Sequence, residues 1–204
     1  MEKALERLRE AFARYPRRAV LEGCPHCRGS VTVDDHDLFS LTISLGNTVG
    51  TSDDVKSFVP LLLERLTVGY ELDPSMVMAK LTQEHWRTWP TAEQKAIDDY
   101  LMAVWRTLLT TYPAKLGSLS NASDFLSTVE ADDFLKEWDN TQGIAPDRHL
   151  ASLVEAWIHD PTLPTQVINW LRRDVIRERL YKAFERDHTE PWSNDFARAH
   201  DYLT

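Results

Sequence analysis

Apolar residues recur about every 3.6 positions in most of the longer segments of this chain. Strand-like alternation of apolar and polar residues is almost absent. A spacing near 3.6 lines up side chains on one face of a helix, whereas a strand needs a period of about 2. The pattern therefore predicts an all-α fold. Short connections between the segments favour a compact multi-helix bundle of about seven to eight helices over an elongated repeat array.

Capping residues and prolines set the expected helix ends. The first helix carries Leu8 and Phe12 on one face and has to end before Pro16. The other expected helices are residues 51–67, 73–87, 91–112, 122–138, 147–160 and 164–186. Residues 38–45 are apolar with β-branched side chains and fit either a short helix or a strand, and we favour a helix. Their expected starts include N-caps at Thr51 or Ser52, Asp73 and Asp147, and a capping box of Thr91 with Gln94. Residues 30–33 are expected to form a short extended piece after the cysteines.

Size and charge limit the class of partner. With 204 residues, of which 43% are hydrophobic and 27% charged, the chain is expected to form one helical domain over residues 1–204. A net charge of −9 repels phosphate backbones, so we expect no nucleic-acid partner, while a basic protein partner is compatible. The start of the chain lacks the apolar core of a secretory signal, and no apolar run approaches the roughly 20 residues of a membrane span. We therefore expect no membrane contact and a cytoplasmic location.

The sequence Cys24-Pro25-His26-Cys27 contains both cysteines of the chain. Thiols at this spacing can exchange disulfides or bind a transition metal. Redox enzymes place such a motif after a buried strand of a βαβ unit, whereas residues 19–23 are too few and too weakly β-forming. A reducing cytoplasm also disfavours a structural disulfide. Thiol–disulfide exchange is therefore the weakest of the hypotheses for this pair.

A structural zinc site fits the local sequence better, because Cys-Pro-x-Cys before Arg28-Gly29 is similar in shape to a zinc knuckle. Zinc takes about four ligands, so histidines or carboxylates have to complete the site. The histidines considered are His26, His36, His85 and His149. His26 lies inside the turn, where it would be strained as a ligand. His36 is close in sequence, and folding can bring His149 near.

The candidate metal ligands are therefore Cys24, Cys27, His149 and His36. The alternative is that both thiols are reduced, partly buried small side chains in a turn set by Gly23 and Pro25.

No sequence signature of a common catalytic mechanism is present. The chain has no GxSxG, P-loop, HExxH or dinucleotide-binding motif. Pairs of adjacent acids occur, but neighbours on a helix diverge by about 100° and do not form a carboxylate dyad. These pairs are Asp53-Asp54, Asp98-Asp99 and Asp132-Asp133. We therefore expect a non-enzymatic function, with no catalytic residue and no organic cofactor.

Three motifs carry a resemblance to a known family. They are Gly23-Cys24-Pro25-His26-Cys27, the run from Thr51 to Pro60, and Trp89-Pro90 followed by Glu93. In this order they resemble the GCPxC, DDFKHFLP and WPxxE motifs of uncharacterised, small, helical bacterial proteins. The likeness covers residues 10–160, and Val55 and Ser57 replace the aromatic residue and the histidine of the second motif. The resemblance implies a helical fold and a bacterial origin, and it implies no activity.

The function expected from these observations is non-catalytic protein binding. The leading hypothesis is an immunity protein that neutralises a cognate bacterial toxin by occluding its active site, with acidic loops facing a basic toxin domain. The alternative is a zinc-binding enzyme or zinc-stabilised regulator that uses Cys24 and Cys27.

Overall fold

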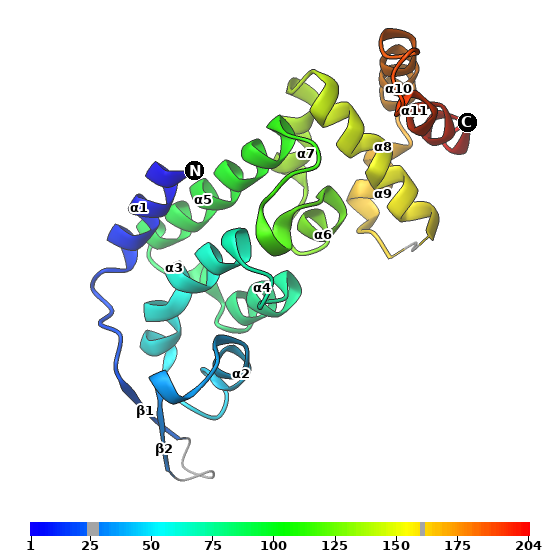
Figure 1. Cartoon of the computed structure of the whole chain (residues 1–204). Coiled ribbons are helices and arrows are strands. Elements are labelled where there is room, and N and C mark those ends of the chain that lie inside the picture. Colours follow the sequence, from blue (N-terminus) through cyan, green and yellow to red (C-terminus); the bar gives the residue numbers. More distant parts are fainter. Residues whose placement is uncertain (24–28, 160–161) are drawn as a thin grey trace. The chain divides into compact units, whose positions relative to one another are not determined.

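A computed structural model describes residues 1–23, 29–159 and 162–204. It contains one two-stranded sheet, short 3-10 turns and eleven α-helices among the described residues (Figure 1). The expected all-α class is confirmed, but the expected number of about seven to eight helices is too low. The chain divides into two compact units, each described separately below. The first comprises Met1–Val104 with Leu116–Ser118, and the second Trp105–Lys115 with Leu119–Thr204.

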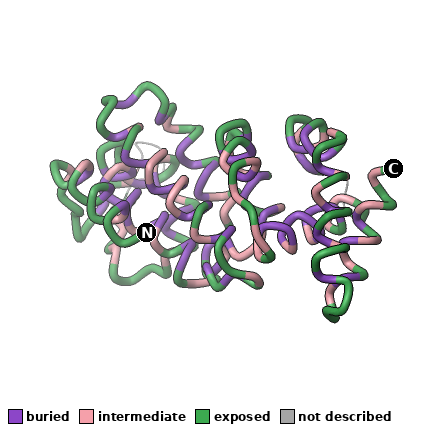
Figure 2. Tube along the Cα trace, turned by 90° about the horizontal axis from the view of Figure 1, so that it is seen from above, coloured by how far each residue is buried: buried purple, intermediate pink, exposed green. Residues whose placement is uncertain are grey.

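The helices of the first unit form where the sequence repeats apolar residues at helical spacing. Figure 2 colours the backbone by burial, and buried and exposed residues alternate along it. They are α1 (Glu2–Phe12), α2 (Leu38–Ser44), α3 (Ser52–Val68), α4 (Pro74–Gln83) and the start of α5 (Thr91–Thr110). Leu8 and Phe12 are buried one turn apart on α1, which packs on α3. Asp73 caps α4 by accepting a hydrogen bond from the Ser75 backbone at 2.7 Å. The helix expected over residues 73–87 is shorter, because a 3-10 turn, η2 (Trp86–Thr88), follows α4.

The cap of α3 is a capping box in which Thr51 and Asp54 exchange hydrogen bonds with each other's backbone. The box expected at Thr91 differs from the observed start of α5. There the Gln94 side chain donates to the Trp89 carbonyl at 2.6 Å, and the backbone N–H groups of Glu93 and Gln94 donate to the Pro90 carbonyl.

A short hairpin precedes α2. Strands β1 (Val20–Glu22) and β2 (Ser30–Thr32) pair in antiparallel register, with Leu21 opposite Val31. The extended piece expected after the cysteines is confirmed, whereas its partner β1 is not expected from its weak β propensity. Gly23 donates its backbone N–H to the Gly29 carbonyl at 2.8 Å. This bond extends the pairing of the two strands by one residue on each strand, beyond Glu22 and Ser30.

The second unit is organised around stacked aromatic rings. It contains the end of α5 with α6 (Ala122–Leu126), α7 (Asp132–Asn140), α8 (Ile144–His159), α9 (Thr165–Leu171), α10 (Asp174–Arg186) and α11 (Ser193–Tyr202). Trp105 and Trp138 are fully buried, with ring centroids 5.2 Å apart. Their indole N–H groups donate to the carbonyls of Phe134 at 2.9 Å and Pro146 at 3.2 Å. These hydrogen bonds allow both tryptophans to be buried without leaving an indole N–H group unsatisfied.

Two long helices expected in this unit are each divided in the structure. The helix expected over 122–138 breaks after Leu126, where Ser127 and Thr128 bond backbone carbonyls of the preceding turn and compete with helix propagation. The helix expected over 164–186 breaks after Leu171, and Asp174 opens α10 with an acid in its first turn. Helix α11 was not expected.

Asp147 is not the N-cap that its sequence position suggests. Helix α8 already begins at Ile144, after Gly143 in a positive-φ conformation of 131°. The Asp147 backbone N–H donates to the Gly143 carbonyl at 3.2 Å, so Asp147 lies inside the first turn. Its carboxylate is buried and bonds two arginines instead.

Candidate functional site

The residues predicted to bind zinc lie in different parts of the chain. Cys24 and Cys27 fall outside the described residues, so the zinc and thiol hypotheses for them stay predictions. His36 is exposed and follows the 3-10 turn η1 (Val33–Asp35) of the first unit. His149 is buried in α8 of the second unit. Within residues 1–23, 29–159 and 162–204, no three His, Cys, Asp or Glu side chains are grouped to hold a metal ion.

His149 is held by neutral partners. Its Nε2 lies 3.0 Å from the Thr111 carbonyl, and its ring packs edge-to-face on Tyr112 with centroids 4.8 Å apart. Burial lowers the pKa of His149, the Thr111 and Leu108 carbonyls oppose this, and the nearby Arg148 cation lowers it further. His149 therefore packs α8 against the end of α5 and the residues that follow it.

The lowered pKa predicts that acid destabilises the protein. Because the unfolded chain binds a proton at His149 more readily than the folded one, this contribution to stability is present above the ordinary pKa of about 6.5. It is lost as the pH falls from there toward the lower pKa of the folded state. We expect the melting temperature of His149→Gln to fall less than that of the wild type between about pH 7.5 and 5.5. Equal slopes in both proteins, measured by thermal unfolding, would contradict this assignment.

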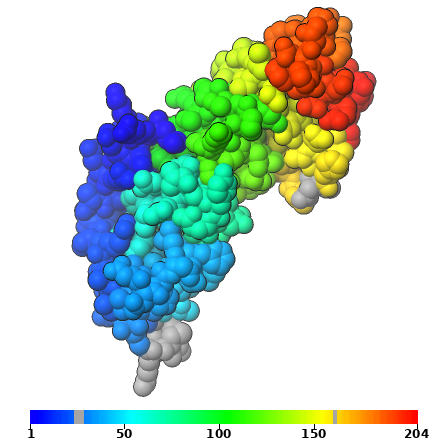
Figure 3. Space-filling view, in the orientation of Figure 1, coloured from blue at the N-terminus to red at the C-terminus, as the bar shows by residue number. Residues whose placement is uncertain are grey.

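Exposed acidic and apolar side chains occur together in the first unit, from η1 to α2, and we call them the acidic surface. Figure 3 draws this part of the chain in blue. The acidic surface comprises Asp34, Asp35, Asp37, Phe39 and Ile43, all of them exposed. Phe39 and Ile43 are 44% and 51% exposed and lie one turn apart on the same face of α2. Between residues 19 and 55 the sequence has a single Lys or Arg, Arg28, so the charge of this surface is dominated by acids.

The acids of this surface differ in their bonding. Asp37 caps α2, accepting hydrogen bonds from the backbone and hydroxyl of Ser40 at 2.9 and 2.8 Å, and these bonds lower the pKa of Asp37. Asp34 and Asp35 form no ion pair with any residue that the structure describes. Their carboxylates are therefore available to a partner.

Buried contacts fix this surface to the rest of the first unit. Leu41 and Leu45 are buried on the opposite side of α2. Lys80, only 5% exposed, donates from Nζ to the Leu45 carbonyl at 2.6 Å, and burial lowers its pKa. The loop after α2 joins the hairpin, because the Gly50 N–H donates to the Glu22 carbonyl at 2.8 Å. Helix α2, which carries Phe39 and Ile43 of the acidic surface, is thus held in place by buried side chains and by these hydrogen bonds.

The second and third family-like motifs meet in a buried polar cluster, which we call the Glu93 cluster. Its members are Arg14, Tyr15, Lys56, Trp89 and Glu93. The Glu93 carboxylate is 1% exposed and accepts hydrogen bonds from the Tyr15 hydroxyl at 2.8 Å and from Arg14. Lys56 Nζ donates to the Tyr15 hydroxyl at 3.2 Å and lies 4.7 Å from the Trp89 ring centre. The cluster ties α3 and α5 to the segment after α1.

Glu93 Oε2 accepts no hydrogen bond from any side chain or backbone group among the described residues. Lys56 Nζ, 3.6 Å away, is its ionic partner. Because Lys56 is itself only 12% exposed, it depends on Glu93 for its counter-charge, whereas Glu93 is also paired with Arg14. The Glu93 and Lys56 side chains are thus buried together, whereas the Arg14 side chain is 57% exposed.

Asp54 of the same motif is also structural. It is buried and accepts hydrogen bonds from Arg18 Nε at 2.8 Å and from the Thr51 backbone at 2.7 Å. The Arg18 guanidinium, with the Thr51 groups, holds the pKa of Asp54 below its usual value. The segment after α1 is therefore clamped to the start of α3.

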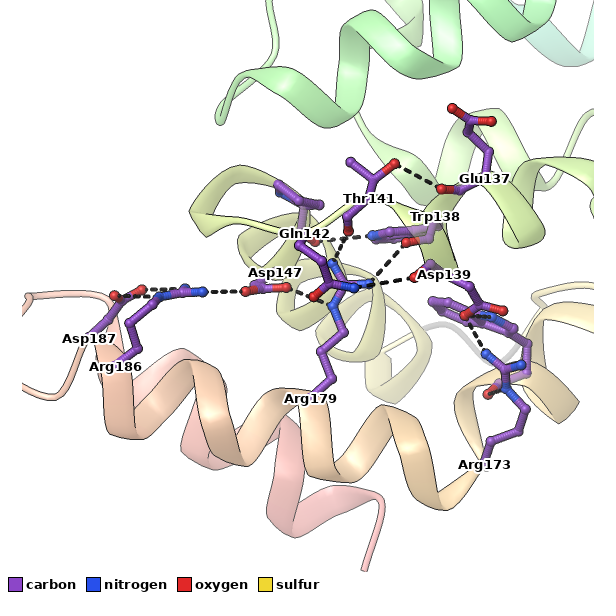
Figure 4. Close-up of polar contacts among 12 residues, drawn as sticks. Glu137, Trp138, Asp139, Thr141, Gln142, Asp147, Arg173, Arg179, Arg186 and Asp187 are labelled. Carbon is purple, nitrogen blue, oxygen red and sulfur yellow. Dashed lines mark hydrogen bonds and ion pairs between the residues drawn. The ribbon is translucent and has the colours of Figure 1, made fainter.

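The second unit has a polar network centred on Asp147 (Figure 4). Arg179 donates to Asp147 Oδ1 at 2.7 Å and to the carbonyls of Trp138 at 3.0 Å and Thr141 at 2.7 Å. Arg186 bridges Asp147 Oδ2 and both Asp187 oxygens, each at 2.7 to 2.8 Å. The sequence motifs give no expectation for Arg179 or Arg186. Their spacing of seven residues on α10, about two helical turns, is the signal that could have revealed them.

A groove of about 540 Å³ runs beside this network, between α10 and the turn before α8. The basic residues on its walls are Arg173, Arg179, Lys182 and Arg186, and each is paired with an acid: Asp139, Asp147, Glu178 and Asp187. The charges of this groove are neutralised internally. The network joins α7, α8 and α10, and leaves no cation of the groove unpaired for a ligand.

No helix in the described parts of the chain combines the length and apolar character that crossing a membrane requires. Comparisons with protein-family models, with curated proteins and with solved structures find no match to this chain. The family resemblance and the functional hypotheses therefore stay predictions.

Proposed function

We propose that this protein is an immunity protein, a non-catalytic protein that binds a cognate bacterial toxin and occludes its active site. The observation that carries the proposal is the acidic surface of Asp34, Asp35, Asp37, Phe39 and Ile43. Toxins that act on nucleic acids or other anions carry basic active sites, which an acidic surface complements.

The composition of the surface suits protein binding. Aromatic and aliphatic side chains that fill a partner's pocket supply most of the binding energy of an interface, and charged residues at the rim steer association. Phe39 and Ile43 are exposed on a short, anchored helix, and Asp34 and Asp35 flank them without ion pairs among the described residues. In contrast, the buried acids Asp54, Glu93 and Asp147 form ion pairs with arginines or lysines of the same chain.

Charge reversal on this surface is expected to abolish tight toxin binding. The variant Asp34→Lys/Asp35→Lys should weaken the complex with the purified toxin encoded beside this chain's gene by about 100-fold, because like charges facing each other across an interface cost several kcal/mol. Isothermal titration calorimetry at two salt concentrations gives the dissociation constant and its electrostatic share.

The matched control is Asp132→Lys/Asp133→Lys, a second pair of adjacent exposed acids in the first turn of α7. It changes the net charge by the same amount and should leave binding within about twofold of the wild type. Phe39→Ala should weaken binding without altering its salt dependence, because it removes an apolar anchor. The proposal fails if the wild type binds no neighbouring toxin, or if both charge reversals weaken binding equally.

A further inference from the structure

An open groove of about 540 Å³ lies between the C-terminal end of α1 and one side of α3 in the first unit. Its walls include the apolar side chains of Phe12, Pro16, Pro60 and Leu61. Its volume falls within the roughly 300–1,000 Å³ of small-molecule sites. The groove lies on segments distinct from the acidic surface of η1 and α2.

Arg17 and Arg9 provide the positive charge of this groove. Arg9 is paired with Glu64 at 2.7 Å. The Arg17 guanidinium lies 4.8 Å from the centre of the Phe58 ring and has no carboxylate partner and no side-chain hydrogen bond among the described residues. Its fork of N–H donors is therefore available to an anion, and stacking on Phe58 limits its motion.

The neighbouring arginines do not share this property. Arg14 is committed to Glu93, and Arg18 to Asp54. The groove beside α10 in the second unit has a similar volume, but all of its cations are paired with acids. Arg17 thus combines an apolar groove of ligand size with a cation that pairs with no acid in residues 1–23, 29–159 and 162–204.

We propose that the α1–α3 groove binds a small organic anion with an apolar body, with the carboxylate or sulfonate held by Arg17 and the apolar body lying against Phe12, Pro60 and Leu61. The charge of Arg17 and the apolar walls select this class. Inorganic phosphate has no apolar part and would leave the apolar walls of the groove exposed to water. A neutral hydrocarbon would leave the Arg17 guanidinium without an anionic partner.

Two probes of nearly the same shape test the proposal. One is 1-anilinonaphthalene-8-sulfonate, and the other is N-phenyl-1-naphthylamine, which lacks the sulfonate. We expect the native, full-length protein to bind the sulfonate about tenfold more tightly than the neutral probe, measured by fluorescence titration. Circular dichroism at the same probe concentrations verifies that the fold is intact, since both probes also bind partly unfolded proteins.

Variants assign the signal to the groove. Arg17→Ala should weaken sulfonate binding about tenfold and leave the neutral probe unchanged, whereas Arg17→Lys should give an intermediate value. Leu61→Asp should weaken both probes. The control is Arg65→Ala, an exposed arginine on α3 that pairs with Glu71. Equal binding of the two probes by the wild type, or sulfonate binding that survives Arg17→Ala, overturns the proposal. Neither outcome depends on toxin binding.

Discussion

Replacing Arg179 by alanine is expected to lower the free energy of unfolding by about 3–5 kcal/mol, because it leaves the buried Asp147 with one arginine partner instead of two and removes the donor to two backbone carbonyls. The side chains of Arg179 and Asp147 are 10% and 5% exposed. Arg179 also donates to the carbonyls of Trp138 and Thr141 at the end of α7. Its loss therefore leaves two carbonyl acceptors and one carboxylate oxygen without this donor. Urea unfolding at pH 7 measures the effect.

Two further variants separate the charge from the packing of this residue. Arg198→Ala removes an arginine of the same unit that is 64% exposed and pairs with Asp195, and it should cost less than about 1 kcal/mol. Arg179→Met/Asp147→Leu replaces both buried charges by apolar groups and should recover much of the loss. If Arg179→Ala is no more destabilising than Arg198→Ala, the Asp147 network does not hold the second unit together.

The same network shows where sequence reasoning stops. Helical periodicity correctly predicts α1, α3 and α5, which are long enough to show several turns of apolar spacing. The seven residues of α2 are too few for this, and periodicity alone leaves them ambiguous between helix and strand. Periodicity gives no information on Asp147, whose carboxylate accepts hydrogen bonds from arginines 32 and 39 residues away. Capping statistics at Asp147 predict a helix start, but tertiary pairing uses the carboxylate instead. Local patterns cannot express a contact made only when distant helices pack.

The candidate sites show a similar limit. The exposed acids of the acidic surface are visible in the sequence as Asp34-Asp35-His36-Asp37. That they form no ion pair with a residue that the structure describes is visible only in the fold. Arg14, Arg17 and Arg18 are close neighbours in the sequence, yet the fold pairs the first and last of them with buried acids. Only Arg17 of the three has no ion-pair partner among the described residues. Which charge is available for binding is therefore a property of the folded chain.

Replacing Glu93 by alanine is expected to destabilise the first unit by about 3–5 kcal/mol, because it leaves the Lys56 ammonium buried without a counter-charge. Lys56 is only 12% exposed, and its remaining partners, the Tyr15 hydroxyl and the Tyr15 and Trp89 rings, carry no full negative charge. Glu93→Gln keeps the size of the side chain and an acceptor for Tyr15, so we expect a smaller loss. Urea unfolding at pH 7 compares the two variants.

The double variant Glu93→Leu/Lys56→Met decides what the Glu93 cluster does. If the cluster only stabilises packing, removing both charges together should cost less than removing Glu93 alone, because no unpaired charge stays buried. The control is Glu71→Ala, which breaks the exposed pair of Glu71 with Arg65 and should cost under about 1 kcal/mol. If the double variant is as unstable as Glu93→Ala, the loss in Glu93→Ala does not come from leaving the Lys56 ammonium without a counter-charge. Since the second and third motifs supply Lys56, Trp89 and Glu93, confirmation would explain these residues by folding stability and leave binding to the exposed surfaces.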